Sequence, residues 1–125
     1  MKKNLVIVCW AANPDRPELC GTPFFHAAAA AAMDVNVEVY FTSAAVRLLK
    51  RGVAESLHTG PQQRETVYGF MQQAAKQGAQ FFACSQALCE YNLSMADLIP
   101  EVAGAAGAAT YVSRGLEDDC ATVVY

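Results

Sequence analysis

The feature that most constrains the fold is an unbroken apolar segment near the amino terminus, residues 5–10. A short run without polar alternation is typical of a strand that is buried on both faces, as the strands of a parallel sheet are. A loop with three prolines follows over residues 13–23, and the alanine-rich residues 24–33 favour a helix that packs closely on a sheet. The chain therefore begins as a strand, a loop and a helix.

The next part of the chain repeats this alternation. Residues 35–41 alternate apolar and polar side chains and predict a second strand with one wetter face. Thr42 and Ser43 favour the start of a short helix through Lys50, closed by Gly52. Apolar residues at helical spacing from position 67 predict an amphipathic helix that stops at Gly78. A third apolar strand then ends at residue 84.

The carboxyl-terminal part contains a possible capping box, Ser94 with Asp97, before apolar residues at helical spacing over 95–106. Pro100 allows either one interrupted helix or a turn followed by a helix from that proline. Strands are predicted over residues 108–112 and 120–125, with an acidic turn at 117–119 between them. Five strands alternating with helices predict an α/β fold: a three-layer α/β/α sandwich with a mostly parallel five-stranded sheet, in a single domain over residues 1–125.

Composition limits the partners of such a domain. The chain carries a net charge of -3, and its nine Lys and Arg residues are scattered, so we expect no nucleic-acid partner. The first apolar run is too short for a signal peptide, and no clean cleavage site follows it. No segment predicts a membrane span. We expect a cytoplasmic protein. Hydrophobic residues make up 54% of the chain and charged residues 17%, which favours a homo-oligomer.

Several chemistries find no support in the sequence. The first strand is followed by neither a glycine-rich dinucleotide turn nor a phosphate-binding loop, and no serine lies in a nucleophile elbow. Five cysteines and two histidines lack zinc-ligand spacing, and an odd number of cysteines does not indicate a disulfide framework. We therefore predict no cofactor and no metal, and free thiols in a reducing compartment.

Cys84 is the strongest candidate for a functional residue. It stands where the third strand turns into a segment that can start a helix, and reactive groups in parallel α/β sheets gather beyond the carboxyl ends of the strands. Backbone N–H groups of Ser85 and Gln86 at that helix start would favour the thiolate, which is the nucleophilic form. Cys89 is five residues away and a poor disulfide partner on a continuous helix. Cys9 would lie near Cys84 only if the first and third strands are neighbours.

Several segments resemble the DsrE/DsrF-like family. They are FFACS at residues 81–85, DLIPEV at 97–102, GAATY at 107–111 and VEVYFT at 37–42, followed by Leu48 and Leu49. The resemblance implies a small α/β/α domain that assembles into trimers or hexamers. It also implies a role in cytoplasmic sulfur trafficking, in which a cysteine after the third strand carries sulfur as a persulfide and exchanges it with carriers of the TusA type. Only Cys84 matches that cysteine.

The sequence therefore predicts a sulfur carrier or sulfurtransferase that uses Cys84. Ser85, Gln86, Cys89 and Cys9 are candidates for assisting roles. Two alternatives remain open at this point: a thiol peroxidase or redox sensor that pairs Cys84 with Cys9 or Cys89, and a noncatalytic oligomeric scaffold in which Cys84 is merely packed.

Overall fold

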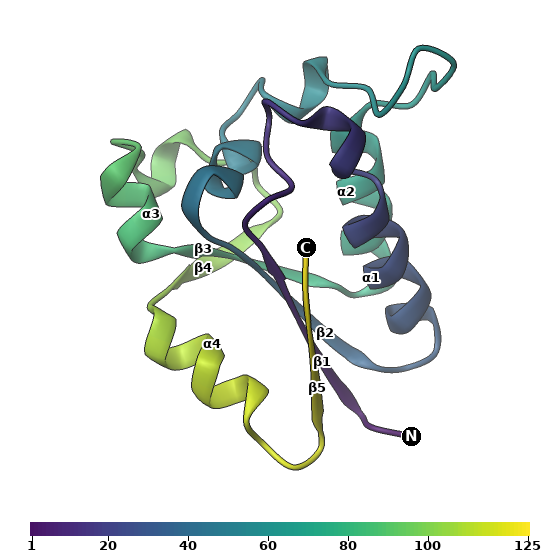
Figure 1. Ribbon diagram of the computed structural model, residues 1–125, viewed down its shortest axis with the longest axis vertical. Helices are drawn as coiled ribbons and strands as arrows, with labels where there is room; N and C mark the ends of the chain where they lie inside the picture. The colour runs from purple at the N-terminus through teal and green to yellow at the C-terminus, as the bar shows by residue number, and fades with distance from the viewer.

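The computed structural model describes residues 1–125, which are organised around one sheet (Figure 1). Its five strands are β1 (Asn4–Cys9), β2 (Asn36–Phe41), β3 (Gln80–Cys84), β4 (Val102–Ala106) and β5 (Cys120–Val124). Their order is β4-β3-β2-β1-β5, and every neighbouring pair is parallel. The predicted fold class is confirmed, with all strands parallel rather than most of them.

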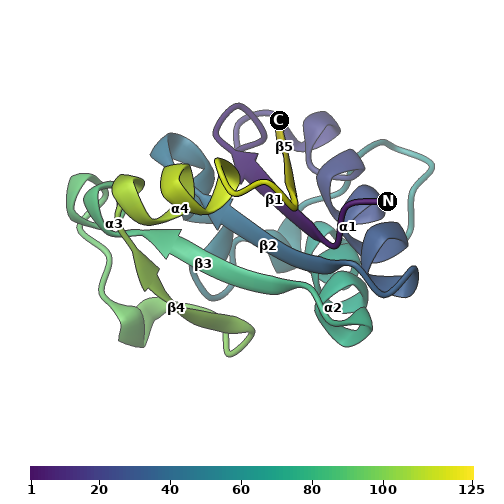
Figure 2. The ribbon, with the colours of Figure 1, turned by 90° about the horizontal axis from the view of Figure 1, so that it is seen from below.

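Four α-helices and four short 3-10 helices connect the strands. The α-helices are α1 (Thr22–Ala32), α2 (Val67–Gln77), α3 (Ser85–Glu90) and α4 (Ala108–Gly115). The 3-10 helices are η1 (Pro17–Leu19), η2 (Ser43–Leu49), η3 (Ala54–Ser56) and η4 (Met95–Asp97). Helices α1 and α2 lie side by side on one face of the sheet, and α4 lies on the other face (Figures 1 and 2). No helix is both long enough and apolar enough to span a bilayer.

The main core fills the space between the sheet and the α1–α2 layer. Successive side chains of a strand point to opposite faces, so Val37, Val39 and Phe41 of β2 share the face toward these helices. The rings of Phe24, Phe41 and Phe81 meet there with centroids 5.5 to 6.0 Å apart. The opposite face has a smaller cluster around Tyr40, and α4 buries none of its residues completely. One face of the sheet is thus much less covered than the other.

Two predicted elements near the carboxyl terminus are wrong. Residues 102–106, expected in a helix, form the edge strand β4, which pairs with β3 around an irregularity between Phe81 and Phe82. Residues 108–112, expected as a strand, begin helix α4. Alanine has the highest intrinsic helix propensity, but propensity is a weak determinant of structure, and a parallel ladder along β3 outweighs it for the segment VAGAA. The sheet still contains five strands because the two errors compensate.

Other local predictions are confirmed. Ser94 and Asp97 form the capping box at the start of η4, with the Asp97 carboxylate 2.9 Å from the Ser94 backbone nitrogen. Gly78 ends α2 with φ of 118°, a left-handed conformation that suits glycine, and the chain then enters β3. The short helix expected after Thr42 is the 3-10 helix η2, and the Thr42 side chain makes no capping hydrogen bond in it.

Candidate active site

The candidate site is built at the carboxyl end of β3, where the chain turns directly into α3. Cys84 is the last residue of β3 and also the N-cap of α3, in an extended conformation. Cys84 is only 4% exposed to solvent, but it lines a pocket of about 210 Å³. The other lining residues are Thr42, Ser43, Gln86, Ala87, Glu90, Ala108 and Tyr111. The sulfur is therefore enclosed by protein on most sides and faces a small cavity.

Strand register explains why Thr42 reaches this sulfur. Phe41 of β2 pairs with Ala83 of β3, so the next residues, Thr42 and Cys84, are neighbours across the two parallel strands. The even-numbered residues Tyr40 and Thr42 also share the α4 side of the sheet with Cys84. Because Thr42 does not cap η2, its hydroxyl is available to the cysteine. Ser43 beside it adopts φ of 51°, a left-handed conformation that is uncommon outside glycine.

Aromatic rings hold Tyr111 in place on the α4 side. The Tyr111 ring lies 5.0 Å from that of Tyr40, and Tyr40 in turn stacks on Phe82 at 5.1 Å. Arg114, one turn further along α4, binds the Glu38 carboxylate of β2 with an Nε–Oε2 distance of 2.8 Å. The helix is thus fixed to the sheet at two points, and Tyr111 faces the pocket of Cys84.

Hydrogen bonds set the acidity of Cys84. Burial raises the pKa of the thiol, but hydrogen bonds from the Thr42 hydroxyl, the backbone N–H groups of Ala87 and Gln86, and the Tyr111 hydroxyl outweigh this effect. The net result is a pKa below the ordinary value for cysteine. Donors that point at a sulfur stabilise its anion, so this arrangement favours the nucleophilic thiolate.

The other cysteines lie in different surroundings. Cys9 is completely buried at the end of β1, and burial, with Cys20 nearby, raises its pKa far above the ordinary value. Burial together with the Glu18 charge raises the pKa of Cys20 to about 12. Cys120 is buried at the start of β5, and all five thiols are free. The pKa of Cys84, in contrast to those of Cys9 and Cys20, is lowered.

The structure brings together only part of the set of residues proposed from the sequence. Gln86 lines the pocket of Cys84, whereas Ser85 and Cys89 are exposed and outside its lining. Strand β2 lies between β1 and β3, so the condition that would place Cys9 near Cys84 is not met. Strand alternation also directs Cys9, like Ile7, to the α1–α2 face rather than the α4 face.

Sequence reasoning missed Thr42, Glu90 and Tyr111. A signal for Thr42 was present, because it follows the second strand as closely as Cys84 ends the third, and parallel strands end at one edge of the sheet. The sequence does not point to Tyr111, because it predicts a strand over residues 108–112, whereas the structure places Tyr111 in helix α4.

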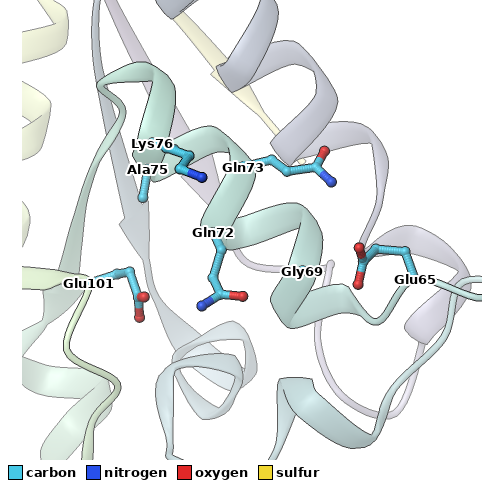
Figure 3. A pocket seen from close by; sticks show the side chains of 7 residues that line it. All are labelled: Glu65, Gly69, Gln72, Gln73, Ala75, Lys76 and Glu101. Carbon is cyan, nitrogen blue, oxygen red and sulfur yellow. The ribbon is translucent and has the colours of Figure 1, made fainter.

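A larger hollow of about 560 Å³ lies along the outer side of α2 (Figure 3). Its lining is mostly polar and consists of Glu65, Gly69, Gln72, Gln73, Ala75, Lys76 and Glu101. It holds no cysteine, and no group of three or more His, Cys, Asp or Glu side chains in the structure is arranged to hold a metal ion. The smaller pocket remains the candidate site, because the nucleophile Cys84 lines it.

Solved structures of similar fold cover nearly the whole chain. The protein of unknown function MTH1491 from Methanobacterium thermoautotrophicum has a TM-score of 0.71 at 20% identity, with 98% of each chain covered. The ychN protein from E. coli has a TM-score of 0.75 at 16% identity, with both chains fully covered. BT1422 from Bacteroides thetaiotaomicron, a conserved protein of unknown function, has a TM-score of 0.68 at 11% identity, with 98% of this chain and 95% of that one covered. At these identities the likeness establishes the fold.

No curated protein matches the sequence. A family model does match it, over residues 4–117, which include four of the five strands and every residue that lines the pocket of Cys84. The family resemblance noted in the sequence is thereby confirmed, and the chain belongs to the DsrE/DsrF-like family.

Proposed function

We propose that this protein is a sulfur carrier or sulfurtransferase that holds sulfane sulfur as a persulfide on Cys84. The observation that carries the proposal is the set of hydrogen-bond donors that lower the pKa of Cys84 inside a small pocket. Membership of the DsrE/DsrF-like family supports a role in sulfur relay. A thiolate is the required form for attack on a sulfur atom, so geometry and family agree on the same chemistry.

The proposed transfer is a thiol exchange at sulfur. The Cys84 thiolate attacks the outer sulfur of a donor persulfide, R–S–SH, and a new S–S bond forms while the donor's S–S bond breaks. The products are Cys84–S–SH and the donor thiolate R–S⁻, so no oxidant or reductant is consumed. The reverse attack, by an acceptor thiolate on the outer sulfur of Cys84–S–SH, returns the cysteine to its thiolate.

The pocket suits this cargo. Its volume of about 210 Å³ leaves space for one further sulfur atom beyond Cys84. We assign the hydroxyls of Thr42 and Tyr111, which face that space, to stabilise the charge on the thiolate and then on the outer sulfur. Gln86 contributes its backbone N–H to the same task.

The partner in this proposal is another thiol carrier, such as a protein of the TusA type. We also propose that the chain acts as a homo-oligomer, a trimer or a hexamer. The α4 face of the sheet supports this, because Val112, Leu116 and Val124 are each more than half exposed there and α4 buries no residue completely. Five unpaired thiols favour a reducing compartment such as the cytoplasm.

The proposal is tested by loading the reduced protein with sulfur and finding where the sulfur is. After incubation with a polysulfide, peptide mass spectrometry of the wild-type protein should show a gain of about 32 Da on the peptide that contains Cys84. Cys84→Ser should lose this gain. Loaded protein mixed with a reduced TusA-type carrier should then transfer the added mass to it.

Cys89→Ser is the matched control, because Cys89 is the other accessible thiol and lies outside the lining of the pocket. This variant should still acquire the added sulfur on Cys84. An equal gain in Cys84→Ser, or sulfur found mainly on Cys89, would refute the assignment of Cys84 as the carrier.

A further inference from the structure

The charge of the Cys84 pocket comes from a single side chain. Among the eight residues that line it, Glu90 is the only charged one, and no Lys, Arg or His contributes. Glu90 is the last residue of α3, is exposed, and makes no ion pair or side-chain hydrogen bond in the structure. Its carboxylate is therefore a negative charge without an ion-pair partner, in the lining of a pocket whose sulfur is itself anionic when reactive.

A cationic group that contacts Tyr91, the residue after Glu90, is engaged elsewhere. Arg47 binds the carboxylate of Asp15 at 2.9 Å, and its guanidinium lies over the Tyr91 ring, 5.2 Å from the ring centroid. Together with Lys50 it lines a separate pocket that does not include Cys84. No Lys, Arg or His therefore forms an ion pair with Glu90 or lines the Cys84 pocket.

We infer that Glu90 determines the specificity of Cys84 by charge, and that the sulfur donor is a neutral or cationic persulfide rather than a small oxyanion such as thiosulfate. That the reagent donates sulfur rests on the proposed function. The selectivity for the charge of the reagent rests only on the residues that line the pocket. Charges of like sign that line one small pocket repel each other, and this repulsion adds to the barrier for any anionic reagent.

The disfavoured reaction is well defined. Attack of the Cys84 thiolate on the outer sulfur of thiosulfate would form Cys84–S–S⁻ and release sulfite. Before the bond breaks, the pocket would hold four negative charges: one on the thiolate, two on thiosulfate and one on Glu90. With a neutral R–S–SH donor the approach involves only the thiolate and Glu90. A donor persulfide flanked by lysine or arginine would be attracted by the same carboxylate, which makes a basic protein surface the best fit to this pocket.

Charge selectivity is measured by alkylation, which needs only the thiolate. The rates of Cys84 modification by neutral iodoacetamide and anionic iodoacetate are followed by peptide mass spectrometry in a Cys89→Ser background, and each rate is divided by that of free 2-mercaptoethanol. We expect iodoacetate to be disfavoured roughly three- to tenfold after this normalisation. Glu90→Gln should remove most of the preference, Glu90→Lys should reverse it, and added salt should weaken it.

Asp118→Asn is the matched control. It removes the same charge from an exposed residue between α4 and β5, at the amino-terminal edge of the sheet and far from the end of β3, and it should leave the preference unchanged. Equal normalised rates in the parent protein, or the same response to Asp118→Asn as to Glu90→Gln, would overturn the inference.

Sulfur loading separates this inference from the proposed function. Equal loading of Cys84 from thiosulfate and from a neutral organic persulfide, R–S–SH, in both the parent protein and Glu90→Gln, would overturn the donor class and leave the carrier function intact. Failure of every donor to load Cys84, with the alkylation preference still present, would instead overturn the carrier function.

Discussion

Thr42 and Tyr111 bring hydroxyl groups to the sulfur of Cys84 from two different parts of the fold. Thr42 follows β2 and makes no other side-chain hydrogen bond, whereas Tyr111 comes from α4 and is held by its contact with the Tyr40 ring. Both line the pocket of Cys84, and hydrogen bonding from these hydroxyls lowers the pKa of its thiol. A hydrogen bond to a charged group contributes about 1.5 to 3 kcal/mol, which is enough to change the protonation state of a thiol near neutral pH.

Thr42→Val should therefore make Cys84 less acidic. The lowered pKa means that the thiolate is favoured in the native protein, so the alkylation rate should rise with pH through a midpoint below the ordinary cysteine value of 9.0. Loss of the Thr42 hydroxyl should move that midpoint upward by about one pH unit. The measurement is the pH dependence of iodoacetamide labelling at Cys84.

Thr42→Ser serves as the control, because it retains the hydroxyl and should keep the wild-type midpoint within about 0.3 unit. An unchanged midpoint in Thr42→Val would show that the hydroxyl does not act on the sulfur.

At this scale the sequence predicts the nucleophile but not its surroundings. Cys84 can be identified from the sequence alone because it lies at the end of a predicted strand. Its donors lie 42 residues before it and 27 residues after it, and which of them meet depends on strand order and register. Of the two predicted N–H donors, Gln86 is one of the groups that lower the pKa of Cys84, and Ala87 is another.

Helix α4 is attached to the sheet through a partly buried ion pair. Arg114 donates through Nε to Glu38 of β2 and through a terminal nitrogen to the Asn4 side chain of β1, at 2.8 and 3.0 Å. Glu38 also accepts a hydrogen bond from the Tyr40 hydroxyl at 2.8 Å. Its side chain is 14% exposed, so removal of the arginine would leave a carboxylate with little access to water.

Arg114→Ala should lower the free energy of unfolding by about 2 kcal/mol, because Glu38 loses its charged partner. The effect should also reach the site, since α4 carries Tyr111, and the labelling midpoint of Cys84 should rise. Urea denaturation and the same alkylation titration measure the two effects.

Arg16→Ala is the matched comparison, because Arg16 pairs with Glu18 on the surface, where both side chains are more than half exposed. That variant should cost less than about 0.5 kcal/mol. Equal destabilisation by the two substitutions would contradict the role of Arg114 in docking α4.

Elements with strong periodicity or clear caps are predictable in this chain, and weak ones are not. The helix that ends at Gly78 and the three apolar strands before residue 85 follow from local pattern. Residues 102–106 continue the helical spacing of the apolar residues before them, so the local pattern favours a helix. Long-range pairing with β3 instead makes this segment a strand. Tertiary contacts therefore make residues 102–106 a strand and residues 108–112 part of a helix, the reverse of the prediction, and the fold class is unchanged.

The uneven covering of the sheet is a property of the whole molecule. Two helices cover one face, and a single helix with no fully buried residue lies on the other. A groove of about 410 Å³ between α4 and the strands β1 and β5 is lined mainly by apolar side chains, among them Val8, Leu116 and Val124. Leu116 is 79% exposed, so an isolated subunit gains almost nothing from this leucine.

If the α4 face is the assembly surface, Leu116→Asp should dissociate the oligomer without unfolding the subunit. Analytical ultracentrifugation should show a shift from the assembled mass toward 13.4 kDa. Circular dichroism should remain that of the wild type, because the substituted side chain is exposed in the subunit.

Met33→Asp provides the comparison. Met33 is 56% exposed at the end of α1, away from the groove, and its substitution should leave the assembled mass unchanged. A wild-type protein that sediments as a monomer would remove the basis for this interface.

The sheet order also has a consequence for how the chain is made. Strand β1, the first to leave the ribosome, lies between β2 and β5, and Asn4 pairs with Cys120. One edge of β1 therefore stays open until β5 is synthesised, and its unpaired backbone groups are able to pair with another nascent chain. The open edge is thus a route to pairing between copies during synthesis, and a chain that stops before residue 120 never closes it.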